Sequence, residues 1–419
     1  EITTRLVGSE MCIRDRSYII KKTCISFIKD YYLDGVFMKL WKRTIAIFLS
    51  TLFITAMPIS ANALEETAIT APSAVLMEPE TGKVLFEKNA HEIRACASIT
   101  KVMTLLLVFE AIDSNKLSMD ETVTASAHAA SMGGSDIWLE EGETMTVDEM
   151  IKATVVASAN DAAVALAEHL CGTEEEFVAK MNQRAKELGM KDTTFKNCNG
   201  LDEEGHLTSA YDVALMSKEL IKHKDIFKYT GIWMDYLRDG KTQLVNTNKL
   251  LKSYNGITGL KTGTTGDAGS CITATATRGN LSLIGVVLGS TSGKERFTDA
   301  ATVLDYGFAN YSMYTPKAPD GAVTDIQVVG GMQGTVKTAV NETTPILIKK
   351  GEEKGITEKL NLPESIDAPI KKGDKVGSVE YTLDKKKIAE SPITADGDVE
   401  QMTFWSVFSV IFSNLLTSR

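Results

Sequence analysis

The sequence predicts an α+β domain, in which an antiparallel sheet packs with helices, followed by a small all-β domain. Over residues 64–316, segments with helical patterning alternate with β-rich runs. Residues 317–398 contain instead only short alternating runs, rich in Gly, Lys and Val. The composition of the 419 residues, 43% hydrophobic and 24% charged, is typical of a globular protein with a sizeable core.

The first predicted domain opens with two strands and a buried helix. Residues 74–77 and 84–86 are β-rich and flank a turn that contains Pro79 and Gly82. From residue 98 to about residue 113, apolar side chains surround nearly the whole helix, which is typical of a helix buried on all sides.

Capping motifs and a hairpin signal predict the rest of this domain. Thr146-x-x-Glu149 and Thr173-x-x-Glu176 each have the pattern of a capping box, so a helix should follow each of them. Between them, one helix should end near residue 158 and another should cover residues 161–171. We expect the strands of both domains after residue 263 at these runs: 271–277 and 281–288, joined by the hairpin signal Arg278-Gly279-Asn280, then 325–329, 335–340, 346–349 and 375–383.

The charge and the Cys and His residues argue against two kinds of function. A formal charge of −10 and a pI near 5.2 argue against nucleic-acid binding, which usually needs a basic face. The five His are scattered without an HExxH-like cluster, so we expect no metal. Four Cys after residue 63 lack CxxC or metal-ligand spacing, and we expect buried free thiols at Cys96, Cys171, Cys198 and Cys271.

Residues 38–63 have the pattern of a secretory signal peptide. Basic residues follow Met38, an uncharged apolar run covers residues 45–57, and Ala61-Asn62-Ala63 is a small-x-small cleavage motif. The run is shorter than the about 20 apolar residues that a membrane span needs, which favours cleavage over the alternative of a spanning helix. Residues 1–37 show no obvious structural role, and residues 1–16 resemble translated sequencing-adaptor text. We expect residues 1–37 to be a non-native extension.

Three short motifs carry the candidate chemistry. They are Ser98-Ile99-Thr100-Lys101, Ser158-Ala159-Asn160 and Lys261-Thr262-Gly263, in this order. Residues three apart on a helix share a face, so Lys101 can reach the Ser98 hydroxyl. Serine is a weak nucleophile without an adjacent base, and burial in an apolar helix would lower the lysine pKa as a base requires.

Each motif alone has little specificity. Another SxxK occurs at residues 26–29, and another Ser-Ala-Asn occurs at residues 60–62. A capping serine or a solvated turn would explain any one motif. The combination is different, because the first motif opens an apolar helix, the second lies at a helix–helix junction and the third precedes β-rich runs. These contexts favour a joint catalytic site.

Together the motifs are the signature shared by penicillin-binding proteins and class A β-lactamases. From about residue 71 to residue 311, the chain resembles the low-molecular-weight penicillin-binding proteins, the serine-type D-alanyl-D-alanine carboxypeptidase family. The resemblance extends to the later β domain and to the terminal helix. It also rests on further phrases: Gly82-Lys83-Val84-Leu85, Lys101-Val102-Met103-Thr104, Asn199-Gly200-Leu201, Gly205-His206, Asp267-Ala268-Gly269, Ala368-Pro369 and Gly373-Asp374-Lys375-Val376-Gly377. One departure is Cys96, where the family often has proline, and it affects the local turn.

The resemblance implies removal of the terminal D-alanine from pentapeptide stems of peptidoglycan through an acyl-enzyme. It implies no cofactor, and inhibition by β-lactams such as penicillin. Ser98 would attack the carbonyl of the penultimate D-alanine, and Lys101 would take its proton. Ser158 would relay a proton to the leaving amine, while Asn160 would hold the substrate amide and the lysine.

The resemblance also implies how the substrate is held. Lys261 and Thr262 would bind the terminal carboxylate, and Gly263 would let the substrate backbone lie against the strand. The oxyanion would be held by the backbone N–H groups of Ser98 and Thr264.

Two alternatives remain at this point. A class A β-lactamase shares the motifs but needs a deacylating glutamate in an ExxLN segment between the second and third motifs, and none is present. A non-catalytic peptidoglycan- or partner-binding protein on the same scaffold would be indicated by loss of Ser98 or Lys101, but both are present. The sequence does not separate carboxypeptidase from endopeptidase or transpeptidase activity.

Residues 399–419 predict an amphipathic helix that anchors the exported protein to the outer face of the cytoplasmic membrane. The apolar run from residue 402 to residue 416 is aromatic-rich but too short to span a bilayer. Ser406, Ser409, Ser413 and Thr417 recur at helical spacing and form a narrow polar side. The alternative is a terminal helix that packs on the β domain or on another chain.

Overall fold

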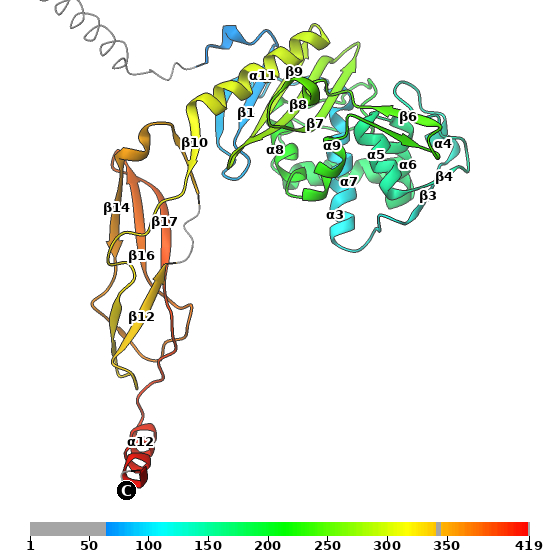
Figure 1. Cartoon of the computed structure of the whole chain (residues 1–419). Helices are drawn as coiled ribbons and strands as arrows, with labels where there is room; N and C mark the ends of the chain where they lie inside the picture. Colours follow the sequence, from blue (N-terminus) through cyan, green and yellow to red (C-terminus); the bar gives the residue numbers. More distant parts are fainter. Residues whose placement is uncertain (1–63, 341–344, 418–419) are drawn as a thin grey trace, which may run out of the picture. The chain divides into compact units, whose positions relative to one another are not determined.

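A computed structural model describes residues 64–340 and 345–417 (Figure 1). The expected extension, residues 1–37, and the expected signal peptide, residues 38–63, lie outside the described residues. The predicted fold class is confirmed, because a domain of helices around an antiparallel sheet precedes an all-β domain. A short 3-10 helix, η2 (Glu66–Ala68), opens the described part of the chain.

Five antiparallel strands form the central sheet in the order β2-β1-β9-β8-β7. They are β1 (Ser73–Met77), β2 (Val84–Lys88), β7 (Ile257–Thr265), β8 (Gly269–Arg278) and β9 (Leu281–Ser290). The predicted opening strand pair and the predicted hairpin are therefore confirmed. The Lys-Thr-Gly motif lies on β7, an edge strand, so one side of its backbone remains unpaired within this sheet.

Different helices cover the two faces of this sheet. Ala74 and Leu76 of β1 pack in a core with α11 (Gly293–Asn310), whereas Val75 and Met77 pack in the core of the other helices. Successive side chains of a strand point to opposite faces, which is why one short strand serves both cores. Figure 1 shows α11 running along the sheet.

The larger core is built mainly from helices. They are α3 (Lys101–Asp113), α4 (Ala127–Ala130), α5 (Val147–Val156), α6 (Asn160–Cys171), α7 (Glu174–Glu187), α8 (Ala210–Leu220), η4 (Lys224–Ile226) and α9 (Phe227–Thr230). The short helix α10 (Leu250–Ser253) packs instead in the core with α11, through Leu250. Two small hairpins accompany them: β3 (Thr122–Thr124) with β4 (Thr144–Thr146), and β5 (Met234–Leu237) with β6 (Thr242–Val245). The capping box at Thr146 and Glu149 is present in full, whereas Thr173 caps only the Glu176 N–H.

The helix expected from residue 98 begins differently. Ser98 lies in a 3-10 turn, η3 (Ala97–Thr100), and the α-helix starts only at Lys101. The cause is the turn before it, where Ala97 has a left-handed backbone with φ of 52° that no α-helix accommodates. Residues three apart eclipse each other in a 3-10 turn, so Ser98 and Lys101 still share one side.

The second domain holds a six-stranded sheet in the order β14-β16-β17-β12-β11-β15. Its strands are β11 (Asp325–Val329), β12 (Thr335–Val340), β14 (Ile356–Asn361), β15 (Ser365–Asp367), β16 (Lys375–Leu383) and β17 (Lys386–Ala395). A separate pair joins β10 (Tyr311–Tyr314) to β13 (Ile346–Lys349), and η5 (Glu352–Gly355) follows. The four predicted strands of this region are confirmed, and β14, β15 and β17 were not predicted.

The helix α12 (Phe404–Thr417) ends the described chain. No helix in residues 64–340 or 345–417 is long and apolar enough to cross a membrane. The four thiols are free, but Cys171 is half-buried whereas Cys96, Cys198 and Cys271 are buried.

Candidate active site

Ser98 is held in a turn that two glycines clamp by close backbone contact. A Cβ atom on Gly263 of β7 would come within 3.0 Å of the Ser98 nitrogen and 2.7 Å of the Cys96 oxygen. A Cβ atom on Gly200, where φ is +89°, would come within 2.1 Å of the Ala97 oxygen. Only glycine fits at either place, and the backbone around Ser98 is therefore fixed from both sides.

Lys101 is placed to act on the Ser98 hydroxyl. Its fully buried Nζ donates to Ser98 Oγ at 3.0 Å, to Asn160 Oδ1 at 2.5 Å and to the Asn199 carbonyl at 2.6 Å. Burial lowers the Lys101 pKa to about 7. A neutral amine keeps two hydrogens for the two amide oxygens, which directs its lone pair at Ser98.

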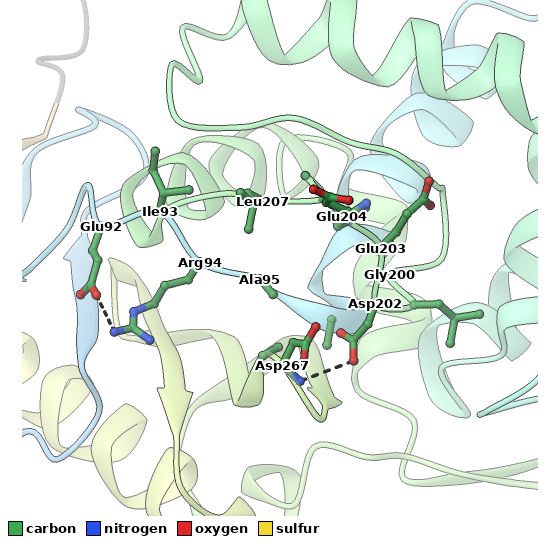
Figure 2. A pocket seen from close by; sticks show the side chains of 15 residues that line it. Glu92, Ile93, Arg94, Ala95, Gly200, Asp202, Glu203, Glu204, Leu207 and Asp267 are labelled. Atoms are coloured by element: carbon green, nitrogen blue, oxygen red, sulfur yellow. Dashed lines mark hydrogen bonds and ion pairs between the residues drawn. The ribbon is translucent and has the colours of Figure 1, made fainter.

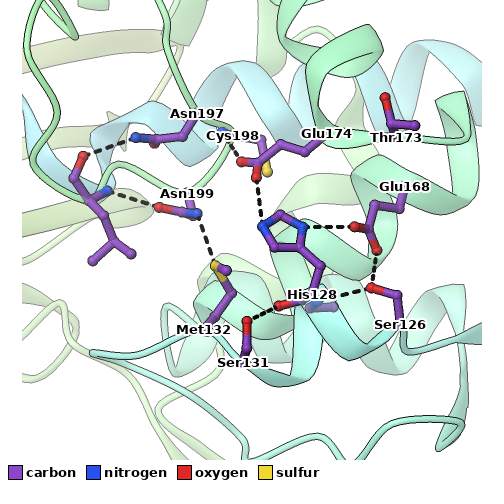
Figure 3. Close-up of polar contacts among 12 residues, drawn as sticks. Ser126, His128, Ser131, Met132, Glu168, Thr173, Glu174, Asn197, Cys198 and Asn199 are labelled. Carbon is purple, nitrogen blue, oxygen red and sulfur yellow. Dashed lines mark hydrogen bonds and ion pairs between the residues drawn. The ribbon is translucent and has the colours of Figure 1, made fainter.

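A polar network supports the carbonyl that Lys101 contacts (Figure 3). The Cys198 N–H, next to Asn199, donates to Glu174 Oε1 at 2.8 Å. His128 bridges Glu174 and Glu168, with its ring nitrogens 3.6 Å and 2.9 Å from the two carboxylates. These residues were not predicted, because the contact to Lys101 is made by a backbone oxygen that no sequence motif reports.

Ser158 and Lys261 form a second pair beside the first. Ser158 lies between α5 and α6 in a left-handed conformation with φ of 63°, a strained geometry that is common at functional sites. Lys261 Nζ donates to Ser158 Oγ at 2.7 Å and to the Thr262 carbonyl at 2.9 Å. Burial holds the Lys261 pKa well below its ordinary value, and the nearby charges of Lys101 and Arg296 lower it further.

Arg296 of α11 is a site residue that the sequence did not reveal. Its Nη1 donates to the Gly263 carbonyl at 2.8 Å and to Thr264 Oγ1 at 2.7 Å. In the described chain, the hydrogen bonds of Lys101, Lys261 and Arg296 all go to hydroxyl, amide or carbonyl oxygens. These three buried or half-buried basic side chains have no carboxylate hydrogen-bond partner among the described residues, so an anion bound beside them would favour their charged forms.

An acidic cavity adjoins the other side of the Ser98 turn (Figure 2). It has a volume of about 590 Å³, touches Ala97 and Gly200, and includes Asp202 and Asp267 among several carboxylates. The Asp267 N–H donates to Asp202 Oδ2 at 3.4 Å, which ties the two walls together. Such a lining repels an anion, so an anionic substrate group should occupy the Arg296 side instead.

The structure brings all eight predicted residues together. Ser98, Lys101 and Asn160 form one hydrogen-bonded group, and Ser158, Lys261 and Thr262 form the next. Gly263 packs on the Ser98 turn, and Thr264 follows it on β7 with its hydroxyl bonded to Arg296. The part that each residue plays in catalysis stays a prediction.

Comparison with known families decides the assignment. A family model described as D-alanyl-D-alanine carboxypeptidase matches residues 60–292, and one described as penicillin-binding protein 5, C-terminal domain, matches residues 311–401. The chain belongs to the D-alanyl-D-alanine carboxypeptidase family. It is a serine-type carboxypeptidase, a hydrolase, and this confirms the predicted function over the β-lactamase and the non-catalytic alternatives.

Individual relatives resemble the carboxypeptidase over most of its length. D-alanyl-D-alanine carboxypeptidase DacF of Bacillus subtilis is 48% identical over 343 residues, or 81% of this chain and 88% of that protein. DacC of Escherichia coli K12 is 34% identical over 350 residues, or 82% and 87%. The structure of penicillin-binding protein 5 from Haemophilus influenzae superposes with a TM-score of 0.67 at 30% identity, covering 80% of this chain and 98% of that one. Ampicillin-bound penicillin-binding protein D2 of Listeria monocytogenes gives 0.51 at 35%, covering 57% and 98%.

Proposed function

We propose that this carboxypeptidase releases the terminal D-alanine from peptidoglycan stem peptides, with Ser98 as nucleophile and Lys101 as base. The contact that carries the proposal is the 3.0 Å hydrogen bond between Lys101 Nζ and Ser98 Oγ. It joins a hydroxyl to an amine whose pKa, about 7, suits a base at neutral pH.

Acylation then follows from the positions of the groups. Neutral Lys101 takes the Ser98 proton as Oγ bonds to the carbonyl carbon of the penultimate D-alanine. The N–H groups of Ser98 and Thr264 stabilise the oxyanion. Collapse breaks the peptide bond, and the proton that Lys101 took passes through Ser158 to the leaving nitrogen, which returns Lys101 to its neutral form. Ser158 is held for this role by its hydrogen bond with Lys261.

Deacylation uses the same groups in reverse. Lys101 takes a proton from water, the water oxygen attacks the ester carbonyl, and the proton returns to Ser98 Oγ. A β-lactam ring presents a similar carbonyl, and the ampicillin- and cefotaxime-bound structures of the Listeria relative support acylation of Ser98 by such compounds.

The substrate carboxylate is held by the cationic side of the site. Lys261 supplies charge, Thr262 and Thr264 supply hydroxyls, and Arg296 bonds to Thr264. An arriving anion would raise the depressed Lys261 pKa, because the charged form then has an opposite charge beside it.

A carboxylate-to-amide change in the substrate tests this assignment. For wild type, kcat/KM for D-alanine release should fall about 100-fold when the terminal D-alanine is amidated, because the charge-assisted bonds are lost. In Lys261→Ala and in Arg296→Gln the same amidation should lower kcat/KM by less than about tenfold, since one of the residues that bind the carboxylate is already missing. Released amino acid measured by chromatography gives both ratios.

The neighbouring exposed Lys294 on α11 provides the control, because Lys294→Ala should keep the full wild-type sensitivity to amidation. Equal sensitivity in all four proteins would show that the carboxylate is bound elsewhere.

We propose further that the protein is exported and that α12 holds it on the outer face of the cytoplasmic membrane. The helix has 14 residues, so it is about 21 Å long, shorter than the about 30 Å hydrocarbon core. Phe404 and Trp405 are 76% and 74% exposed, and Leu415 and Leu416 are 68% and 66% exposed. Exposed aromatic and aliphatic side chains on a short helix favour a position in the plane of the interface.

Removal of α12 should release the enzyme from membranes without changing its chemistry. A chain that ends at Asp398 should lose co-sedimentation with anionic liposomes, while the full-length mature chain should pellet with them. Release of D-alanine from a small peptide should stay within about twofold, because the site residues all lie before Arg296 or at it. If the truncated and the full-length proteins partition alike, the anchor proposal is wrong, and packing of the helix on protein becomes the explanation.

A further inference from the structure

Trp138 projects from the catalytic domain in a strained backbone conformation. It is 78% exposed, whereas its neighbours Ile137 and Leu139 are 1% and 4% exposed. Its φ is 55°, in the left-handed region that bulky side chains rarely adopt. Strain of this kind persists only where the surroundings hold the backbone, and it gathers at sites that bind ligands.

Two charged side chains hold Trp138 in this conformation. The buried Asp161 carboxylate accepts hydrogen bonds from the N–H groups on either side of it, at 3.1 Å from Ile137 and 3.0 Å from Leu139. Arg238 donates to the Ile137 carbonyl at 2.8 Å and to the Trp138 carbonyl at 3.3 Å. The exposed indole is therefore carried by a fixed support and pays little ordering entropy when it binds a ligand.

The same loop is tied to the catalytic groups. Asn160, which accepts the Lys101 hydrogen bond, donates from its side chain to the Gly133 carbonyl at 2.7 Å and from its backbone to the Ser135 carbonyl at 2.6 Å. Trp138 lies three residues beyond Ser135, which is at most about 11 Å of chain. Trp138 is thus at the rim of the active site.

A second apolar surface continues this rim. On one face of the β5–β6 hairpin, Met234 lies opposite Val245, and Tyr236 lies on the same face two residues away; they are 46%, 41% and 48% exposed. Arg238, which follows β5, is the residue that bonds the Trp138 carbonyl. Beyond β6, Thr247 Oγ1 accepts a hydrogen bond from Thr262 of the Lys-Thr-Gly motif at 2.6 Å. We call Trp138, Met234, Tyr236 and Val245 the aromatic rim.

We propose that the aromatic rim binds the glycan strand to which the stem peptide is attached. The Trp138 loop adjoins the active site through Asn160, the residue assigned to the substrate amide, so the part of the substrate that precedes the scissile bond can extend past the rim. This inference rests on the proposed function, because it takes the substrate to be a stem peptide. Four residues remain on the sugar side of the scissile bond, and fully extended they can carry the sugar up to about 14 Å from Ser98.

Sugar chemistry suits this surface. The faces of pyranose rings present polarised C–H groups, and these pack against the electron-rich faces of indole and phenol rings. The polar edges of Trp138 and Tyr236 can meet sugar hydroxyl and acetamido groups. Exposed apolar side chains gathered on a rigid support are typical of a surface that binds a ligand.

Two matched substrates test the proposal. One is a free pentapeptide that ends in D-Ala-D-Ala, and the other is the same pentapeptide on its N-acetylglucosamine–N-acetylmuramic acid disaccharide. In wild type, kcat/KM should be higher for the disaccharide pentapeptide. In Trp138→Ala and Tyr236→Ala the ratio of the two kcat/KM values should fall about tenfold, whereas Trp138→Phe should keep most of it.

Val323→Ala serves as the control, because Val323 is a 55% exposed apolar residue of the other domain, and it should keep the wild-type ratio. A ratio near one in wild type, or an unchanged ratio in Trp138→Ala, overturns the inference. So does an equal loss on both substrates, which would mean that the rim contacts the peptide. If wild type cleaves neither substrate, the proposed function fails instead.

Discussion

Ser98→Ala is expected to abolish both penicillin labelling and D-alanine release. The turn holds Ser98 Oγ 3.0 Å from the Lys101 amine, and among the described residues no second hydroxyl is hydrogen-bonded to that amine. Release of D-alanine should fall by more than about 10,000-fold, because the members of such a group act as a unit. Intact-protein mass spectrometry after penicillin, with mapping of the modified peptide, measures the labelling.

The control for this change lies at the far end of α3, the helix that follows the Ser98 turn. Ser114 follows α3 at its C-terminal end, and Ser114→Ala should keep normal labelling. Thermal unfolding should show that Ser98→Ala remains folded, since Ser98 is only half-buried. A labelled Ser98→Ala protein would overturn the assignment of the nucleophile.

Lys101→Arg is expected to lose acylation by about 1,000-fold or more, although it keeps the positive charge. Arginine does not deprotonate in proteins, so it offers no lone pair to Ser98. In wild type, burial lowers the Lys101 pKa to about 7, and the neutral amine is the active form. The wild-type acylation rate should therefore increase as the pH is raised through about 7. Below pH 7 the rate should be low, because Lys101 is protonated there.

Stopped-flow acylation with a chromogenic cephalosporin between pH 5 and pH 9 measures this profile. Lys83→Arg, a change on the turn before β2, should leave the profile as it is in wild type. A Lys101→Arg enzyme with near-normal rates, or a wild-type profile without a step near pH 7, would show that another group is the base.

Local signals predicted most of this fold. In the second domain, β11 and β12 were predicted because polar and apolar residues alternate in them, as in a strand with one buried face. β14 was missed because its residues are mostly exposed and polar and show no alternation. β17 contains Pro392, which argues against a strand when the sequence is read alone.

In the site too, residues that belong to short sequence motifs were predicted, whereas residues that only the fold brings to the site were not. Ser98, Lys101 and Lys261 were predicted because their motifs are short and ordered along the chain. Arg296 was not predicted, since nothing around it on α11 indicates that its guanidinium reaches the backbone of β7. The Asn199 carbonyl was not predicted either, because every residue carries the same backbone oxygen.

The two glycines that clamp the Ser98 turn have a consequence for how the enzyme tolerates mutation. Contacts between main chains, at Gly200 and at Gly263, fix where the nucleophile stands, and side-chain shape contributes little at these points. Apolar residues elsewhere in the core can therefore be exchanged for one another without moving the Ser98 hydroxyl oxygen. Gly200 and Gly263 themselves do not tolerate substitution, because any side chain there would displace Ser98 directly. Selection on catalysis thus weighs on two residues that carry no functional group at all.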